Sequence, residues 1–191
     1  PRKVLKVDSP KLKRINKGNL KFDYEAIING QKYVLSKKTL SAFTEIPERL
    51  EIYLNGDRQV VADYLNGKTI DCDVNSALTL NVCGKMMEID ELINIGITKF
   101  IDFDNAVYLS NRIDLRSIER TNVIEFISVH YKRFTHNGRF RNLPADVAAA
   151  IIRTLPEPGL TQKHILKLVF QNTLGGDDKT PLVKLLNFDD L

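Results

Sequence analysis

The sequence predicts an α+β protein that is mostly helical, with its β structure confined to the first half of the chain. Two observations lead to this class. One strong hairpin signal, Asn29-Gly30, stands between two runs of β-forming residues, and from Asp73 onward the apolar residues recur at helical spacing. The composition, with 43% hydrophobic and 27% charged residues, is typical of a folded soluble chain. No apolar run approaches the ~18 residues that a membrane-spanning helix needs.

The hairpin is predicted from Tyr24 to Leu35. Asn-Gly is the strongest short hairpin signal, because both residues of its turn need positive φ. Ser36 then offers an N-cap for a short helix from Lys37 to Phe43. A further helix is expected from Glu48 to Leu54, because Pro47 suits the first helical turn.

The rest of the chain is divided into helices by capping residues and by turns rich in glycine and proline. Lys68 to Cys72 is expected to be a short edge strand, and Pro156-Glu157-Pro158-Gly159 breaks the helical pattern of the second half. The helices are predicted over Val60 to Leu65 and Asn105 to Asn111, after the caps Asp73, Asp90, Thr161 and Thr180, and from Ser117 and Pro144 onward.

Charge divides the chain further. Residues 1–22 carry eight Lys or Arg and one acid, so the rest is net acidic although the whole chain has a net charge of +4. We therefore expect a disordered basic leader over residues 1–21, a mixed domain over 22–103 and a helical domain over 104–191. Such a leader can attract nucleic acid or acidic proteins. Its candidate nucleic-acid-binding residues are Lys11, Lys13, Arg14 and Lys17.

Several segments of the mixed domain occur together in one order. The hairpin leads into a helix carrying Leu40 and Phe43, and a later helix ends in Asp63-Tyr64-Leu65-Asn66-Gly67. Lys68-Thr69-Ile70, Asn75 and Ile89-Asp90-Glu91-Leu92 follow at matching spacing. Taken together, these segments resemble a BTB (POZ) domain.

The helical domain carries a second set of short matches. They are Phe126-Ile127 with His130-Tyr131-Lys132-Arg133-Phe134, then Phe140-Arg141-Asn142-Leu143-Pro144, and Leu185-Leu186-Asn187-Phe188. This set is similar to the helical BACK extension that follows BTB domains. The combined resemblance covers residues 22–191. It implies a small BTB/POZ-like cluster of hairpin and helices followed by an all-α BACK-like domain.

The resemblance implies an intracellular adaptor, cytoplasmic or nuclear, that binds other proteins and self-associates. Many BTB–BACK proteins also recruit a cullin scaffold for ubiquitin transfer. The family's cullin contact corresponds here to the segment from Tyr64 to Asn75, which makes five residues candidates for partner binding: Tyr64, Leu65, Lys68, Thr69 and Asp71. Core packing is an equally good interpretation of Tyr64 and Leu65.

The segment between Phe43 and Val60 is shorter than in the family, which usually has a further strand there. A lone two-stranded ribbon is marginal in water and must be covered, and this segment leaves few residues to cover it. A second subunit is the simplest cover, because two-fold dimers are the commonest oligomers. The expected homodimer interface consists of Ile27, Tyr33, Leu40 and Phe43.

The sequence carries no motif for catalysis, cofactor binding or metal binding. Cys72 and Cys83 lie in apolar segments without C-x-x-C spacing, and no glycine-rich phosphate loop occurs. The histidines are His130, His136 and His164; the first lies on an apolar helical face and the other two are expected at the surface. We expect no enzyme activity, cofactor or metal.

Two other functions stay open. One is nucleic-acid binding through the basic leader, which would fade steeply with added salt, whereas binding to a protein partner would persist. The other is a viral or structural assembly protein that uses the same fold only to oligomerise.

Overall fold

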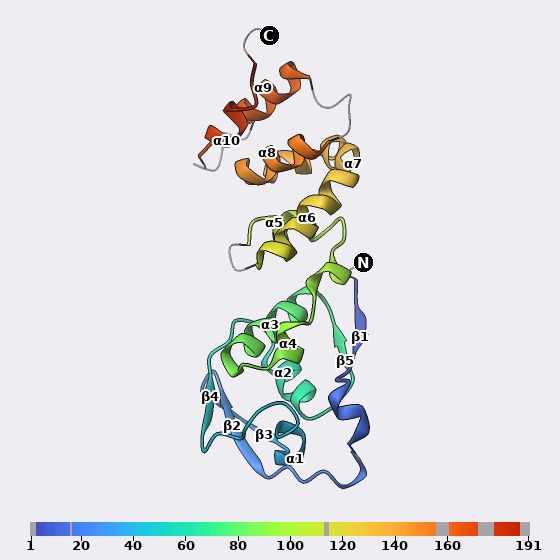
Figure 1. Cartoon of the computed structure of the whole chain (residues 1–191), viewed down its shortest axis with the longest axis vertical. Coiled ribbons are helices and arrows are strands. Elements are labelled where there is room, and N and C mark those ends of the chain that lie inside the picture. Colours follow the sequence, from blue (N-terminus) through green and yellow to red (C-terminus); the bar gives the residue numbers. More distant parts are fainter. Residues whose placement is uncertain (1–2, 16, 113–114, 156–160, 172–177, 188–191) are drawn as a thin grey trace. The chain divides into compact units, whose positions relative to one another are not determined.

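The structure is a computed structural model, and it describes residues 3–15, 17–112, 115–155, 161–171 and 178–187. The chain divides into two compact units, Pro1–Phe100 and Ile101–Leu191. All the described strands lie in the first unit, and the second unit is helical in its described residues (Figure 1). The protein therefore belongs to the mixed α and β class. The boundary falls close to residue 103, where the sequence places the end of the mixed domain.

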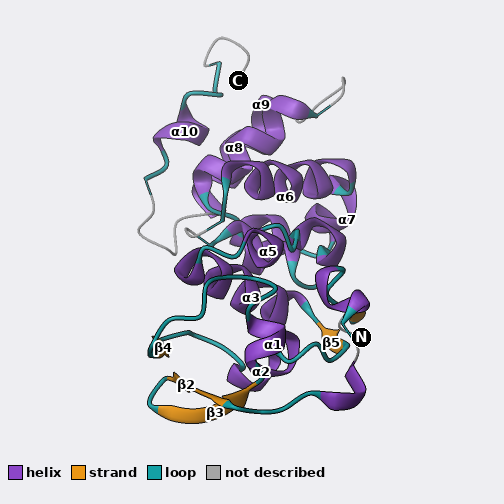
Figure 2. Cartoon of the chain, turned by 60° about the horizontal axis from the view of Figure 1, so that its bottom comes forward, coloured by secondary structure: helices purple, strands orange, loops and turns teal. Residues whose placement is uncertain are grey.

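The predicted hairpin is confirmed. It consists of β2 (Tyr24–Ile28) and β3 (Gln31–Leu35), which pair antiparallel. The turn residues Asn29 and Gly30 have φ values of 51° and 76°, as this tight turn requires. Figure 2 shows the hairpin with helices of the first unit on one side of it. The buried side chains of β2 are Tyr24, Ala26 and Ile28.

A third strand stands where the sequence predicts a helix from Glu48 to Leu54. β4 (Leu50–Ile52) pairs parallel with β2, so the sheet order is β3-β2-β4. Leu50 and Ile52 are buried and the residue between them is exposed, which is the alternation of a half-buried strand. The helix prediction is wrong because it relied on Pro47, and a proline just before an edge strand is equally well tolerated.

Asn29 also holds the end of β4 in place. Its side-chain Nδ2 donates a hydrogen bond to the carbonyl oxygen of Leu54, and the Leu54 N–H donates to Asn29 Oδ1, with 2.6 Å between the heavy atoms in each case. The Asn29 backbone N–H donates to the carbonyl of Ile52 at 2.8 Å. A residue of the hairpin turn therefore continues the ladder beyond the last residue of β4.

Asn66 closes the edge of β3 in the same manner. It follows α2 (Arg58–Leu65) and is buried. Its Oδ1 accepts a hydrogen bond from the Ser36 backbone N–H at 2.9 Å, and its Nδ2 donates to the carbonyl of Val34 at 3.1 Å. The short helix α1 (Lys37–Leu40) begins directly after this contact.

The longest helix of the first unit is α3 (Val74–Met87). The Asp73 carboxylate caps it by accepting from the Ser76 N–H at 2.9 Å, as predicted. The next predicted helix is interrupted, because it consists of α4 (Asp90–Ile93) and a separate 3-10 turn, Ile97–Phe100. The apolar residues of this stretch still reach the core: Leu92, Ile97 and Phe100 are fully buried.

The leader is ordered in its described residues, which corrects the expectation of a disordered segment. β1 (Leu5–Val7) pairs antiparallel with β5 (Ile70–Cys72), and 3-10 turns follow at Lys11–Arg14 and Lys17–Asn19 (Figure 1). Leu12 is only 1% exposed. The sequence hides this docking because the apolar leader residues are too few to form a periodic pattern among the lysines.

The second unit is built around α6 (Ser117–Val129), which packs against α5 (Ala106–Ser110) and α8 (Ala145–Thr154). Its inward residues Val123 and Ile127 are fully buried. The other described elements are α7 (Tyr131–His136), a 3-10 turn (Arg139–Asn142), α9 (Gln162–Gln171) and α10 (Thr180–Val183). The predicted break at residues 156–159 lies outside the described residues.

Candidate functional site

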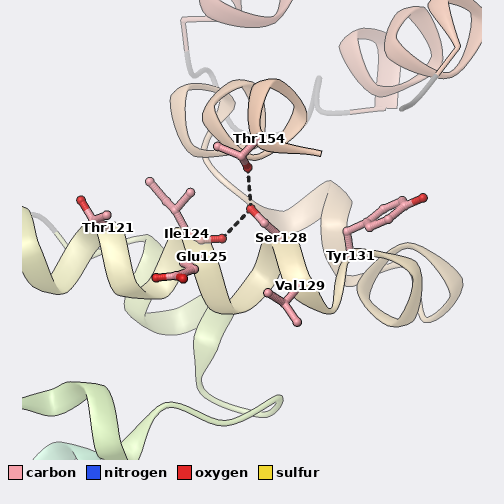
Figure 3. A pocket seen from close by; sticks show the side chains of 7 residues that line it. All are labelled: Thr121, Ile124, Glu125, Ser128, Val129, Tyr131 and Thr154. Carbon is pink, nitrogen blue, oxygen red and sulfur yellow. Dashed lines mark hydrogen bonds between the residues drawn. The ribbon is translucent and has the colours of Figure 1, made fainter. Parts of the chain in front are cut away.

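An open groove runs along α6 in the second unit and has a volume of about 470 Å³ (Figure 3). Five of its residues come from α6, one from α7 and one from α8. They are Thr121, Ile124, Glu125, Ser128, Val129, Tyr131 and Thr154. Most of the lining is apolar surface, so the groove can accept an apolar side chain from a partner.

The groove exists because α6 buries only one of its faces. Val123 and Ile127 face the core, whereas Thr121, Ile124 and Ser128 repeat at helical spacing on another face. Val129, at the end of the helix, is 73% exposed. A valine left in water at a helix end makes no contribution to the core, so its surface is available to a partner.

A pair of hydroxyl groups fixes one wall of the groove. Ser128 Oγ donates to the carbonyl oxygen of Ile124 at 2.8 Å, and it lies 2.8 Å from Thr154 Oγ1 (Figure 3). This contact links α6 to the last residue of α8. The wall is therefore built by two helices that this contact joins.

The charge of the groove comes from Glu125. Glu125 is exposed, and none of the ion pairs in the described part of the second unit involves its carboxylate. The groove therefore offers a carboxylate beside apolar surface, which suits a partner with an apolar side chain near a cation. Among the described residues that line the groove, no histidine stands beside the hydroxyl of Ser128.

A cluster of aromatic and cationic side chains stiffens the same unit. Two guanidinium groups lie against the Phe103 ring, that of Arg133 at 4.1 Å and that of Arg139 at 4.4 Å from its centre. Arg139 also donates to the Phe103 carbonyl oxygen at 2.6 Å and pairs with Asp104 at 3.0 Å. The Phe103 and Phe134 rings are 4.4 Å apart between centroids, so this cluster anchors the residues before α5 to α7.

Sequence reasoning missed the groove. It predicted only the buried face of α6, whereas the groove depends on residues outside that face and on Thr154 from another helix. One signal was present: Val129 is an apolar residue that does not share the helical face of Val123 and Ile127.

The five predicted partner-binding residues divide into two groups. Tyr64 and Leu65 are 1% and 0% exposed, so they belong to the core and the prediction is wrong for them. The Tyr64 hydroxyl donates to Glu91 Oε1 at 2.9 Å, and burial, reinforced by Glu91, raises the pKa of this phenol. The other three are exposed: Lys68, Thr69 and Asp71.

Two of these exposed residues, Lys68 and Asp71, are engaged in ion pairs on the surface. Lys68 Nζ lies 2.7 Å from Asp63, and Asp71 lies 2.8 Å from Nζ of Lys6 in the leader. The leader strand thus covers part of the surface that the resemblance assigns to a partner.

The predicted dimer interface also needs correction. Leu40 is 0% and Phe43 9% exposed, and the Phe43 ring centre is 6.1 Å from that of Tyr64, so both belong to the core. Ile27 and Tyr33 are only partly buried. The premise that the hairpin lacks cover is wrong, because β4 pairs with β2 and the helices of this unit bury its inner face.

The described leader residues that were candidates for nucleic-acid binding lie on the surface. Lys11, Lys13 and Arg14 are exposed, and Lys13 pairs with Asp8 at 3.3 Å. The side chain of Lys17 lies outside the described part of the chain. The described cations of this group are thus on the surface, one of them already paired.

The cysteines and histidines form no common site. Cys72 and Cys83 are buried, and burial raises the pKa of their thiols to about 11 and about 12. His130 is exposed and its ring centre lies 4.8 Å from that of Phe126. Within the described ranges, no group of three or more His, Cys, Asp or Glu side chains could hold a metal ion. Nor does any described helix have the length and apolar character to cross a membrane.

Comparison with known proteins identifies no family for this chain. No protein-family model matches the chain. No curated protein matches it either.

Proposed function

We propose that this protein is a protein-binding adaptor and that the groove along α6 holds a side chain of its partner. The observation that carries the proposal is the combination of exposed Val129 with a mostly apolar groove in which Glu125 has no ion-pair partner among the described residues. Such a surface offers apolar contact for affinity and one charge for orientation.

The finer form of the proposal is an adaptor of BTB–BACK type that recruits a cullin scaffold. Its support is the order of elements in the first unit, with a hairpin, a short helix and then a third strand between Phe43 and Val60. This third strand is β4. BTB domains usually have a strand in this segment, whereas the sequence predicts none here. Exposed Lys68 and Thr69 are the residues left to contact a cullin.

The test of the groove compares two residues of the same helix. Val129 and Ile118 are both exposed apolar residues of α6, at 73% and 59%, but only Val129 lines the groove. A charge at Val129 should repel an apolar side chain at no cost to the core. We expect Val129→Glu to remove the partner from affinity capture, while Ile118→Glu retains it.

The result would be read as the ratio of partner recovered by the two variants, with equal expression and equal thermal unfolding as controls. A partner that both variants retain equally would contradict the role of the groove. Binding that instead fades steeply between low and moderate salt would favour the nucleic-acid alternative.

Self-association remains part of the proposal, but it needs another surface. Partly buried Ile27 in β2 and 54% exposed Val34 in β3 belong to the outer face of the sheet, and Tyr53, directly after β4, is 66% exposed. We expect light scattering to give twice the chain mass for the native protein and the monomer mass for Val34→Glu. A monomer mass for the native protein would remove self-association from the proposal.

A further inference from the structure

The edge of β5 is occupied by the chain's own leader. β5 (Ile70–Cys72) pairs only with β1 among the described strands, with Lys6 opposite Asp71 and Val7 opposite Ile70. This two-stranded sheet is separate from the sheet of the hairpin. Without the leader, the backbone N–H and C=O groups of β5 would have no strand beside them, and such an edge is a template for another strand.

A short pattern of buried and paired side chains holds the leader at this edge. Val7 is buried at 8% exposure, Lys6 lies outward and pairs with Asp71 at 2.8 Å, and Leu12 is buried at 1%. Between these residues, Ser9 is 3% exposed, and its Oγ accepts from the Leu12 N–H at 3.2 Å. The pattern is an apolar residue after a basic one, a small polar residue and a second apolar anchor.

The floor of this site is also built in advance. Tyr64 is buried and its hydroxyl donates to Glu91 at 2.9 Å, while Ser9 of the leader is near enough to lower the pKa of this phenol against the larger effect of burial. Asp73 caps α3 directly after β5 and so fixes the end of the strand. The site therefore has two apolar positions, a fixed hydroxyl and an exposed carboxylate.

The pairing itself is short enough to exchange. Each strand has three residues, and short two-stranded ribbons are marginal in water. The Lys6 and Asp71 side chains are 73% and 64% exposed, and exposed ion pairs add little stability. A segment held mostly by two buried side chains can open locally while the rest of the unit stays folded.

We propose that the β5 edge is a strand-addition site for an extended segment of a partner protein, and that the leader occupies this site in cis as a competing pseudo-ligand. The partner segment carries a basic residue, facing Asp71, followed by an apolar residue in the Val7 position and a second apolar residue in the Leu12 position. The inference rests on the protein-binding function proposed above, but it concerns the first unit and does not depend on the α6 groove.

The test uses the full chain and a fluorescent synthetic peptide with the sequence of residues 3–15. An open variant combines Val7→Asp with Leu12→Asp, because charges at buried positions favour the undocked leader. We expect the peptide to bind the open variant at least about tenfold more tightly than the native chain, in which the tethered leader competes at high effective concentration. Fluorescence anisotropy gives both affinities.

Charge reversal separates specific strand addition from general stickiness. A peptide with Lys6→Glu should bind the open variant at least about threefold more weakly, and an open variant with Asp71→Lys should prefer that peptide instead. No binding to a folded open variant, or binding that ignores the sign at Asp71, would overturn the proposal. A doubled mass of the native chain that the peptide converts to monomer would assign the edge to a second copy and also overturn it.

A second measurement covers the case in which the open variant does not fold. In the full chain with Val7→Ala alone, which removes most of a buried anchor of the leader, hydrogen exchange at the β5 amides should become faster while exchange in β2 and β3 stays unchanged. Unchanged protection of β5 would overturn the proposal. Because the Val129→Glu comparison tests the other unit, failure of this inference and failure of the proposed function give different results.

Discussion

At the scale of single residues, two backbones approach closely where α3 meets α4. Gly84 lies at this contact, and a Cβ added there would be 2.6 Å from the Ile93 backbone nitrogen and 2.6 Å from Leu92 Cβ. Such distances are below any real contact, and a backbone atom cannot rotate away. The glycine is therefore required by packing, although glycine is a poor helix former.

Gly84→Ala is predicted to destabilise the protein by about 1–3 kcal/mol, because overpacking outweighs the better helix propensity of alanine. Gly96→Ala is the matched control, since an added Cβ there meets nothing within 4 Å. The measurement is the free energy of unfolding in urea for both variants. Equal stability of the two would show that α3 and α4 are less closely packed than described.

The thiols give a second residue-scale prediction. Burial raises the pKa of Cys72 to about 11 and that of Cys83 to about 12, above the ordinary value of about 8.5. The neutral thiols therefore favour the fold, and their contribution to stability falls as pH rises above about 8.5. We expect no reaction with a disulfide reagent at pH about 8 until urea unfolds the chain, and rapid reaction of the native protein would contradict this burial.

At the scale of elements, two asparagine side chains form hydrogen bonds with backbone groups that the short strands of the sheet leave without a strand partner. Asn29 pairs with the backbone of Leu54 beyond β4, and Asn66 pairs with Ser36 and Val34 beside β3. Each side-chain amide supplies one donor and one acceptor, as a backbone peptide group does. These contacts fix the edges of a small sheet.

Asn66→Ala is predicted to cost about 2–3 kcal/mol, because it leaves the Ser36 N–H and the Val34 carbonyl without their partner in a buried place. Asn75→Ala is the control, since Asn75 is exposed in the first turn of α3. Thermal unfolding of the two variants checks the prediction. A control that loses as much stability as Asn66→Ala would exclude a special role for the buried amide.

The elements differ in how far the sequence could predict them, and the reason is the range of the interactions that form them. The hairpin and α3 follow from local signals, Asn29-Gly30 and the Asp73 cap, which act within a few residues. β4 has only three residues and forms because β2, earlier in the chain, lies beside it. β1 depends in the same way on β5, so neither short strand has a local signal of its own.

At the scale of the whole molecule, the chain is two units with different construction. The first combines the described strands with helices, of which α3 is the longest, and the second is helical in its described residues. The sequence predicts this division because the pattern of turns and apolar spacing changes along the chain. It could not predict the groove, which needs α6 and α8 to be placed together, and it left core packing of Tyr64 as one of two interpretations, between which only the burial of this residue decides.

The central claim is that the surface of α6 around Val129 binds a partner protein. The most direct measurement places a photo-crosslinking amino acid at residue 129 in one protein and at residue 118 in another, and identifies the crosslinked products by mass spectrometry. We predict one dominant protein product at residue 129, with its crosslinked peptide apolar and carrying a cation, and no such product at residue 118. Equal yields at both positions, or no protein product at residue 129, would contradict the claim.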